Sequence, residues 1–303
     1  MSQRWALLLC AAAGVYMLWL VCLPAAAPTA APLPSPAAAA SPPPTQTPAP
    51  RPSDSPVPEA LPEIKLKNDT DLPVDVPALS AEPLTQKLAP EGVQVLILHT
   101  HGTEAYAPEP GREYAATDPY RTTDPEYSVI RVGEVLAAAL RRQGLQVAHD
   151  TGLYDYPRYA GAYDRSEAAI RTWLERCPTI AVVIDLHRDA LGSGKTPYKT
   201  LSSLPGGAAQ VMLVAGTGEN GLAHPRWREN LKLALALQRS MDQRCPTLTR
   251  PLELVRERYN QHLTTGSLIL EVGTNGNTLT EAERAAELFA LAAGPVFLSL
   301  VDY

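Results

Sequence analysis

The sequence predicts an α/β fold in which helices flank a central, mainly parallel sheet, preceded by a membrane anchor and a linker. Three observations support this prediction. From residue 93 onward, short apolar segments alternate with helical ones, which is typical of a parallel sheet covered on both faces. Residues 5–23 form an uncharged stretch long enough to cross a bilayer, which takes roughly 20 apolar residues. Residues 24–60 are rich in Pro, Ala, Ser and Thr and have no apolar period.

The composition excludes one class of partner. The chain has 303 residues and a formal net charge of −6, and its Lys and Arg residues are dispersed. Nucleic-acid-binding proteins normally carry a basic patch or stripe, so nucleic acid is not expected as a partner. The length allows one sizeable domain with appendages, or at most two domains.

The first 60 residues predict a tether. We interpret residues 1–23 as a single membrane-spanning helix; the alternative is a secretory signal, for which residues 25–27 offer a cleavage site. Cleaved signals usually have an apolar stretch of only about 7–15 residues, which favours the anchor. Under both interpretations the remainder lies outside the cytoplasm. Residues 24–60 then form a semi-rigid spacer, and residues 61–303 form the folded domain.

The folded region is expected to alternate strands and helices. The first long helix ends at Gly144, a residue suited to a left-handed helix end. Asp164 and Glu167 are predicted to cap the second helix, and Thr280 and Glu283 the last one. The remaining expected elements are an extended stretch at 64–70, strands at 93–98, 145–149, 179–187, 210–216 and 267–273, and helices at 129–143 and 227–241.

Residues that can bind a metal follow three of the predicted strands. His101 and Glu104 come just after one apolar strand, His187 ends a second, and Glu271 lies near the end of the last. In open α/β sheets, binding sites lie outside the carboxyl ends of the strands, so residues distant in sequence can meet there. Two histidines and one carboxylate form a common catalytic zinc set with one position left for water. We therefore predict a Zn²⁺ site formed by His101, Glu104 and His187.

Two further carboxylates bear on this site. Glu271, in an otherwise apolar strand end, suits the catalytic acid/base, because burial would raise its pKa towards the working range. Glu126, at the start of a helix, is the alternative to Glu104 as metal ligand, although a carboxylate there also stabilises a helix N-terminus. The H-x-x-E spacing of His101 and Glu104 favours Glu104, since one turn can close it on a single ion.

Four residues are predicted to contact the substrate. Tyr106 and Arg121 belong to the long loop after the first apolar strand, where a cover over the substrate would lie. Asn260 and His262 precede the last strand and are placed to line the site. The other histidines, for which packing, surface or supporting roles are expected, are His99, His149 and His224.

Five sequence blocks together resemble the stage II sporulation protein P family. They are HTHGTEAYAP, YRTTDPEYSVIRVGEVL, YDRS, VVIDLHRDA and RYNQHLTTGSLILEVGTNGNT. In this order they span nearly the whole region from residue 61 to the C-terminus. The N-terminal anchor and the proline-rich spacer are consistent with the resemblance.

The resemblance implies a fold and an activity. The family is similar to zinc-dependent N-acetylmuramoyl-L-alanine amidases, which implies an amidase-like α/β fold and hydrolysis of the amide between muramic acid and the stem peptide. Endopeptidase activity on cross-linked peptides is also attributed to the family. Carried to matching positions, His101 and His187 become metal ligands and Glu271 the acid/base. The resemblance further implies a place in the mother-cell membrane facing the septum, where peptidoglycan is remodelled during engulfment alongside the transglycosylase stage II sporulation protein D.

Two alternative functions are open at this point. A zinc carboxypeptidase also uses H-x-x-E and a later histidine, and it would need an arginine such as Arg121 or Arg188 to hold a free C-terminal carboxylate. A non-catalytic peptidoglycan-binding module would tether the wall to the membrane. Such a module has no need for Glu271, which favours an enzyme.

Overall fold

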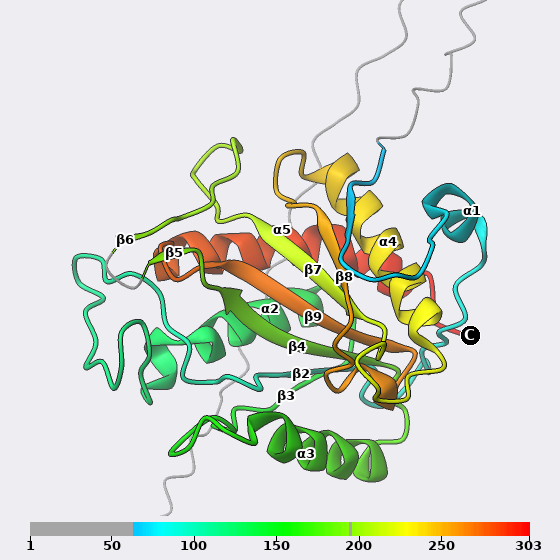
Figure 1. The fold of residues 1–303 in the computed structure, drawn as a ribbon, viewed down its shortest axis with the longest axis horizontal. Helices are drawn as coiled ribbons and strands as arrows, with labels where there is room; N and C mark the ends of the chain where they lie inside the picture. Colours follow the sequence, from blue (N-terminus) through cyan, green and yellow to red (C-terminus); the bar gives the residue numbers. More distant parts are fainter. Residues whose placement is uncertain (1–62, 194–195) are drawn as a thin grey trace, which may run out of the picture. The chain divides into compact units, whose positions relative to one another are not determined.

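The computed structural model describes residues 63–193 and 196–303 and confirms the α/β class. Seven strands form one sheet in the order β1-β8-β7-β9-β4-β2-β3, and β5 and β6 form a separate hairpin (Figure 1). The strands are β1 (Leu66–Asn68), β2 (Val95–Leu98), β3 (Val147–His149), β4 (Val182–Asp189), β5 (Gly192–Ser193), β6 (Thr196–Pro197), β7 (Val211–Gly216), β8 (Leu252–Val255) and β9 (Gly266–Thr274).

The helices cover the two faces of the sheet unequally. α2, α4 and α5 pack on one face, which contributes alternate strand residues such as Ile184 and Leu270 to the larger apolar cluster. α3 lies on the other face, where its Ile170 packs with Leu96. Over β7 and β9 this second face is packed by Tyr259 of a loop. The helices are α1 (Val76–Ala81), α2 (Val129–Arg142), α3 (Ala162–Arg176), α4 (Trp227–Arg244) and α5 (Leu279–Leu298), with short 3-10 turns η1 (Pro125–Tyr127) and η2 (Gln261–Leu263).

The strand directions bring the carboxyl ends of β2, β4 and β9 to one edge of the sheet. β4 runs parallel to both β2 and β9, whereas β7 runs antiparallel to β9, so the sheet is mainly parallel, as predicted. In the β4–β9 pair, His187 lies opposite Glu271. Paired residues of neighbouring strands project to the same face. Both side chains therefore project to the face that carries α3.

Two of the predicted helix caps are wrong. α3 begins after Gly161, which has a left-handed backbone (φ 77°), so Asp164 lies inside the first turn. α5 begins two residues earlier than the predicted pair requires, and its capping box is formed by Thr278 and Glu281. The threonine–glutamate spacing occurs twice in TLTEAE, and the tight turn after β9 selects the first copy. Gly144 does take the expected left-handed conformation (φ 99°) after α2.

The predicted anchor, 1–23, and the predicted spacer, 24–60, lie outside the residues that the structure describes. Within residues 63–193 and 196–303, no helix is both long and apolar enough to cross a membrane.

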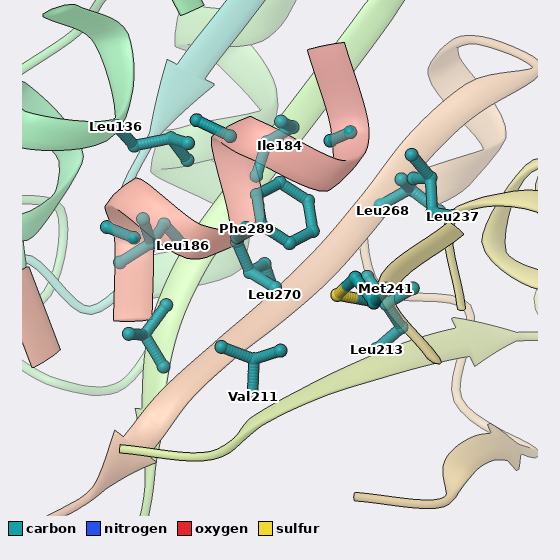
Figure 2. Packing of buried hydrophobic residues seen from close by; sticks show 14 of the residues in the cluster. Leu136, Ile184, Leu186, Val211, Leu213, Leu237, Met241, Leu268, Leu270 and Phe289 are labelled. Carbon is teal, nitrogen blue, oxygen red and sulfur yellow. The ribbon is translucent and has the colours of Figure 1, made fainter. Parts of the chain in front are cut away.

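Phe289 of α5 is fully buried where α5 meets the sheet, beside Leu186 and Leu270 (Figure 2). Truncating it leaves a cavity, so Phe289→Ala is expected to lower the free energy of unfolding by about 3–5 kcal/mol. Leu291, on the same helix but 52% exposed, provides the control, and Leu291→Ala should change stability by less than about 0.5 kcal/mol. Equilibrium denaturation with guanidinium measures both; equal effects would contradict the assigned core.

His224 is a buried histidine before α4, and neither ring nitrogen has a hydrogen-bond partner in the described residues. Burial, with a smaller effect of His262, lowers the pKa of His224 to about 4. An unfolded histidine titrates near pH 6.5. Between these two values the unfolded chain binds more protons than the folded one, so His224 destabilises the fold as the pH falls through this range.

His224→Phe is therefore expected to flatten the acid dependence of stability. Between pH 7 and pH 4 the parent chain should lose up to about 3 kcal/mol more free energy of unfolding than the variant. Denaturant titrations at the two pH values measure the difference. Two parallel pH profiles would show that His224 is solvated or protonated in the folded state.

Candidate active site

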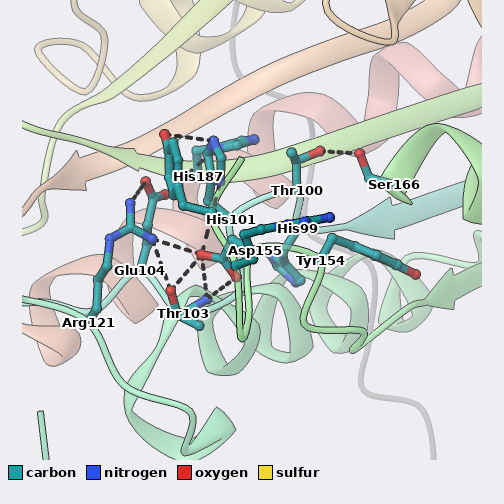
Figure 3. A network of polar contacts seen from close by, with 12 residues as sticks. His99, Thr100, His101, Thr103, Glu104, Arg121, Tyr154, Asp155, Ser166 and His187 are labelled. Carbon is teal, nitrogen blue, oxygen red and sulfur yellow. Dashed lines mark hydrogen bonds and ion pairs between the residues drawn. The ribbon is translucent and has the colours of Figure 1, made fainter. Parts of the chain in front are cut away.

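The predicted metal-binding histidines meet on the α3 face of the sheet, at the ends of β2 and β4 (Figure 3). The rings of His101 and His187 lie edge to face, with their centroids 5.3 Å apart. His101 lies in the turn that follows β2, and His187 lies in β4 next to Glu271 of β9. Residues separated by as many as 170 positions are thus brought together by parallel pairing of three strands.

Glu104 faces His187 across this site. Its Oε2 lies 3.5 Å from His187 Nδ1 and accepts a hydrogen bond of 3.2 Å from the backbone N–H of Arg188. Its Oε1 lies 3.6 Å from the Arg188 guanidinium and 3.5 Å from that of Arg121. Burial would raise the pKa of Glu104, but Arg188 and His187 outweigh burial and lower it to about 2. Glu104 is therefore a buried, permanently charged carboxylate.

Asp185 supports His187 from the same strand. Its Oδ1 lies 2.9 Å from His187 Nε2, close enough for an ion pair but not aligned as a hydrogen bond. Thr100 holds the carboxylate by donating its backbone N–H at 2.8 Å and its hydroxyl at 2.6 Å. Burial lowers the pKa of His187, but Asp185 and Glu104 outweigh it and raise the pKa well above 6.5.

His101 is covered by Tyr159. The two rings stack with centroids 4.5 Å apart, and the Tyr159 hydroxyl lies 3.1 Å from His101 Nε2. On the other side, Asp155 Oδ2 lies 4.0 Å from His101 Nδ1. Asp155 is itself held by Thr103 and by Arg121, whose Nη1 donates to it at 2.7 Å. Burial and the neighbouring His187 lower the pKa of His101, so its ring is a neutral donor of lone pairs.

Glu271 carries a carboxyl group with an unusual environment. Its Oε2 is buried and has no hydrogen-bond partner among the described residues. Burial is the main cause that raises the pKa of Glu271 to about 8, while His187 acts in the opposite direction. A carboxyl group that titrates near neutral pH can both accept and donate a proton at working pH.

The donor set fits a zinc ion in its chemistry. His101 Nδ1 is buried without a hydrogen-bond partner, and an unsatisfied buried nitrogen is costly unless something binds it. The His187 ring directs Nδ1 towards Glu104 and Nε2 towards Asp185. Across residues 63–193 and 196–303, however, no group of three or more His, Cys, Asp or Glu side chains is arranged as a ready metal site. Glu104 also contacts Arg121 and the backbone of Arg188.

The structure separates the two candidate carboxylate ligands. Glu126 is an exposed residue of η1, and it lines a different cavity, of about 270 Å³, with Glu134 and His149. Glu104 is the carboxylate that contacts His187. Of the two alternatives, the geometry favours Glu104.

Of the four predicted substrate-contacting residues, two are buried and a third lies away from the predicted metal-binding histidines. Tyr106 is 1% exposed and its hydroxyl donates to the carbonyl of Val272, so it is part of the core beneath the site. Asn260 is buried and donates to the Tyr163 carbonyl and the Ser166 hydroxyl. His262 lies in η2, before β9, next to Glu167 and Arg171 of α3. Arg121 does lie at the site, against Asp155 and Glu104.

His99 supports the strand end, as expected. Its Nδ1 lies 2.9 Å from the Leu186 carbonyl oxygen, and its Nε2 lies 2.9 Å from Nε2 of His149. Burial and the neighbouring His149 lower the pKa of His99 to about 3, so the ring is neutral. Gly133 of α2 makes room for this pair, since a Cβ there would lie 2.5 Å from His99 Nε2.

Comparison with known proteins decides the family. A sequence profile of stage II sporulation protein P matches residues 46–293. The chain belongs to the stage II sporulation protein P family. Stage II sporulation protein P of Bacillus subtilis (strain 168) is 30% identical over 215 residues, which is 67% of this chain and 50% of that protein. The chain thus spans about half the length of this curated relative.

Solved structures resemble the fold of this family member at low identity. The CwlD amidase from Clostridioides difficile, in complex with the GerS lipoprotein, is 14% identical, with 68% of this chain and 98% of that chain covered and a TM-score of 0.40. The N-acetylmuramyl-L-alanine amidase Ami1 from Mycobacterium abscessus is 12% identical, with 69% and 99% covered and a TM-score of 0.41. Likeness at this level says nothing about activity, which depends on the site itself.

Four residues at this site have roles that were not predicted from the sequence. Asp185 had a usable signal, because it lies two residues before His187 in a strand and therefore shares its face. Arg188 was considered only as a substrate anchor, yet its side chain donates to the carbonyls of Ala105 and Tyr120 and ties down the loop. Asp155 and Tyr159 come from an irregular loop, which has no periodicity that could have revealed them.

Proposed function

We propose that the chain is a zinc-dependent peptidoglycan hydrolase that cleaves the amide between N-acetylmuramic acid and L-alanine of the stem peptide. One observation carries the proposal: two imidazoles and a charged carboxylate converge within a few ångströms, beside a carboxyl group with a pKa of about 8. Membership of the stage II sporulation protein P family supports the wall as substrate and sporulation as the setting. Cleavage of cross-linked stem peptides is the second reaction we assign to the same site.

His101, Glu104 and His187 would hold the zinc ion. When bound, the ion supplies Lewis-acid polarisation of the scissile carbonyl and lowers the pKa of a water molecule. Glu271 takes the proton from the attacking water and returns it to the leaving nitrogen, a double task for which a pKa near the working pH is suited. Its position opposite His187 in the β4–β9 pair supports this role.

The remaining site residues act as positioning groups. Asp185 orients the His187 ring, in the way that carboxylates commonly orient metal-binding histidines. Asp155 ties Thr103 and Arg121 together next to His101, which holds the loop 99–104 in place. Arg188 fixes the loop that carries Glu104.

We further propose that residues 1–23 anchor the protein in the mother-cell membrane and that residues 24–60 extend the domain into the wall. The uncharged stretch and the proline-rich composition support this arrangement. Wall remodelling at the septum during engulfment, together with the transglycosylase stage II sporulation protein D, is the role that family membership supports.

The contacts of Arg188 and Arg121 argue against a carboxypeptidase, which needs a free arginine to hold the substrate's C-terminal carboxylate. Arg188 is 7% exposed and its guanidinium is committed to the carbonyls of Ala105 and Tyr120 and to Glu104. Arg121 is committed to Asp155 and Thr103. Neither guanidinium is left to hold the C-terminal carboxylate of a peptide.

Digestion of intact sacculi and purified muropeptides tests the proposal directly. The purified chain is incubated with each substrate, with and without a chelator, and the products are identified by mass. We expect release of intact stem peptides with a new L-alanine N-terminus, lost on chelation and restored by zinc. Removal of only the terminal residue would favour a carboxypeptidase, and wall binding without metal-dependent release would favour a non-catalytic module.

A further inference from the structure

A second recessed surface lies on the side of the fold formed by α1, α4, the end of α5 and β1. Two neighbouring cavities, of about 360 and 730 Å³, both include Ser80 and Arg239 in their linings. We call this pair of cavities the Arg239 groove. It shares no lining residue with the active site, and Figure 1 shows α1 and α4 well away from the loop after β2 that carries His101.

Polar atoms without partners lie in the Arg239 groove. Arg239 Nε and Ser80 Oγ are both buried, and neither has a hydrogen-bond partner among the described residues. Leaving a buried donor unpaired is unfavourable, and it is most unfavourable for a charged group. Ser80 comes from α1 and Arg239 from α4, so the residues that carry these two unpaired atoms belong to separate elements that line the same cavities.

The groove is also positively charged. Glu82, one of its two lining carboxylates, is already paired with Arg228 at 3.6 Å and with Lys232 at 3.5 Å. Glu63, the other carboxylate, lines the larger cavity. Of the ion pairs that the described residues form, none involves the three other lining cations, which are Lys65, Arg239 and Arg244.

Apolar side chains line part of each cavity, beside the polar ones. Leu79, Leu84 and Val296 line the smaller cavity, and Ile64 and Val76 line the larger one. A planar guanidinium recognises a carboxylate through two parallel hydrogen bonds. A carboxylate with an apolar residue on each side would therefore fill the whole groove. A phosphate polymer would satisfy Arg239 but would leave these apolar side chains uncovered.

We propose that the Arg239 groove binds an acidic peptide segment of a partner protein, in which Asp or Glu is flanked by apolar residues. The carboxylate of that segment pairs with Arg239 and accepts a hydrogen bond from the Ser80 hydroxyl. The apolar residues on either side of it contact the apolar side chains that line the two cavities. The groove thereby attaches the domain to a partner without covering the active site.

A peptide array on the full-length chain tests this proposal. The probes are labelled hexapeptides with a central Asp or Glu between Leu, Val, Ile or Phe residues. Each is compared with its amide twin, a control peptide in which Asn or Gln replaces the central Asp or Glu. Fluorescence polarisation should find acidic peptides that bind at least tenfold more tightly than their amide twins. Arg239→Ala should weaken that binding at least tenfold, and Arg239→Lys should weaken it less.

Arg176→Ala is the matched control, since Arg176 is an exposed arginine of α3 outside the groove, and it should leave peptide binding unchanged. Thermal melts and sacculus digestion should be the same for Arg239→Ala and the parent chain, because Arg239 lies outside the active site. Acidic peptides that bind no better than their amide twins, or equally to Arg239→Ala, would overturn the proposal. Inorganic phosphate that displaces the peptides at equal concentration would instead identify a simple anion site.

Discussion

Glu271→Gln is expected to keep bound zinc while lowering turnover on sacculi by about 10²–10⁴-fold, the usual contribution of a positioned acid/base. Glutamine has nearly the same shape, but it can neither accept the proton of water nor return it to the leaving nitrogen. Glu271 Oε2 makes no hydrogen bond that the amide of glutamine could lose, so folding should not suffer. Zinc content by mass spectrometry and product release from one preparation measure the two quantities together.

Glu126→Gln is the matched control for this experiment. Glu126 is the other carboxylate that the sequence placed near the site, and it is exposed and lines a separate cavity. Its variant should retain both zinc and turnover. Near-normal rates for Glu271→Gln would disprove the acid/base assignment, and loss of zinc in that variant would make Glu271 a ligand instead.

His101→Ala and His187→Ala are each expected to abolish zinc retention and cleavage together. Each removes one of three donors, and a site with only two protein ligands holds zinc poorly. His187→Ala should also leave the Asp185 carboxylate buried beside an empty space, so a lower melting temperature is expected for this variant alone. Zinc stoichiometry after dialysis, sacculus digestion and thermal melts measure the three effects.

His262→Ala provides the control for both histidine variants. His262 was also predicted to lie at the site, but it contacts Glu167 and Arg171 instead. Its variant should bind one zinc ion per chain and digest sacculi normally. If His101→Ala retained zinc at the parent stoichiometry, the ion would have to be held elsewhere and the proposed mechanism would fail.

The local sequence pattern was sufficient to predict the strands that carry the site. The apolar run before His99 and the run that ends at His187 were recognisable because central parallel strands are buried on both faces and read as unbroken apolar segments. Caps were harder to place. Thr278–Glu281 and Thr280–Glu283 have the same spacing, and only the turn after β9 and the binding of Glu283 by Arg112 and Arg131 distinguish them.

The sequence by itself determined the α/β class, the family and the grouping of His101, Glu104, His187 and Glu271 at the strand ends. These follow from periodicity and from residue types next to apolar runs, which are local properties. Only the tertiary structure shows that Glu104 rather than Glu126 contacts His187 and that Tyr106 and Asn260 are buried. It also shows that His262 lies against Glu167 and that Asp155 and Tyr159 lie beside His101. Those contacts depend on how loops fold back over the sheet. Contacts between distant loop residues produce no periodic pattern in the sequence.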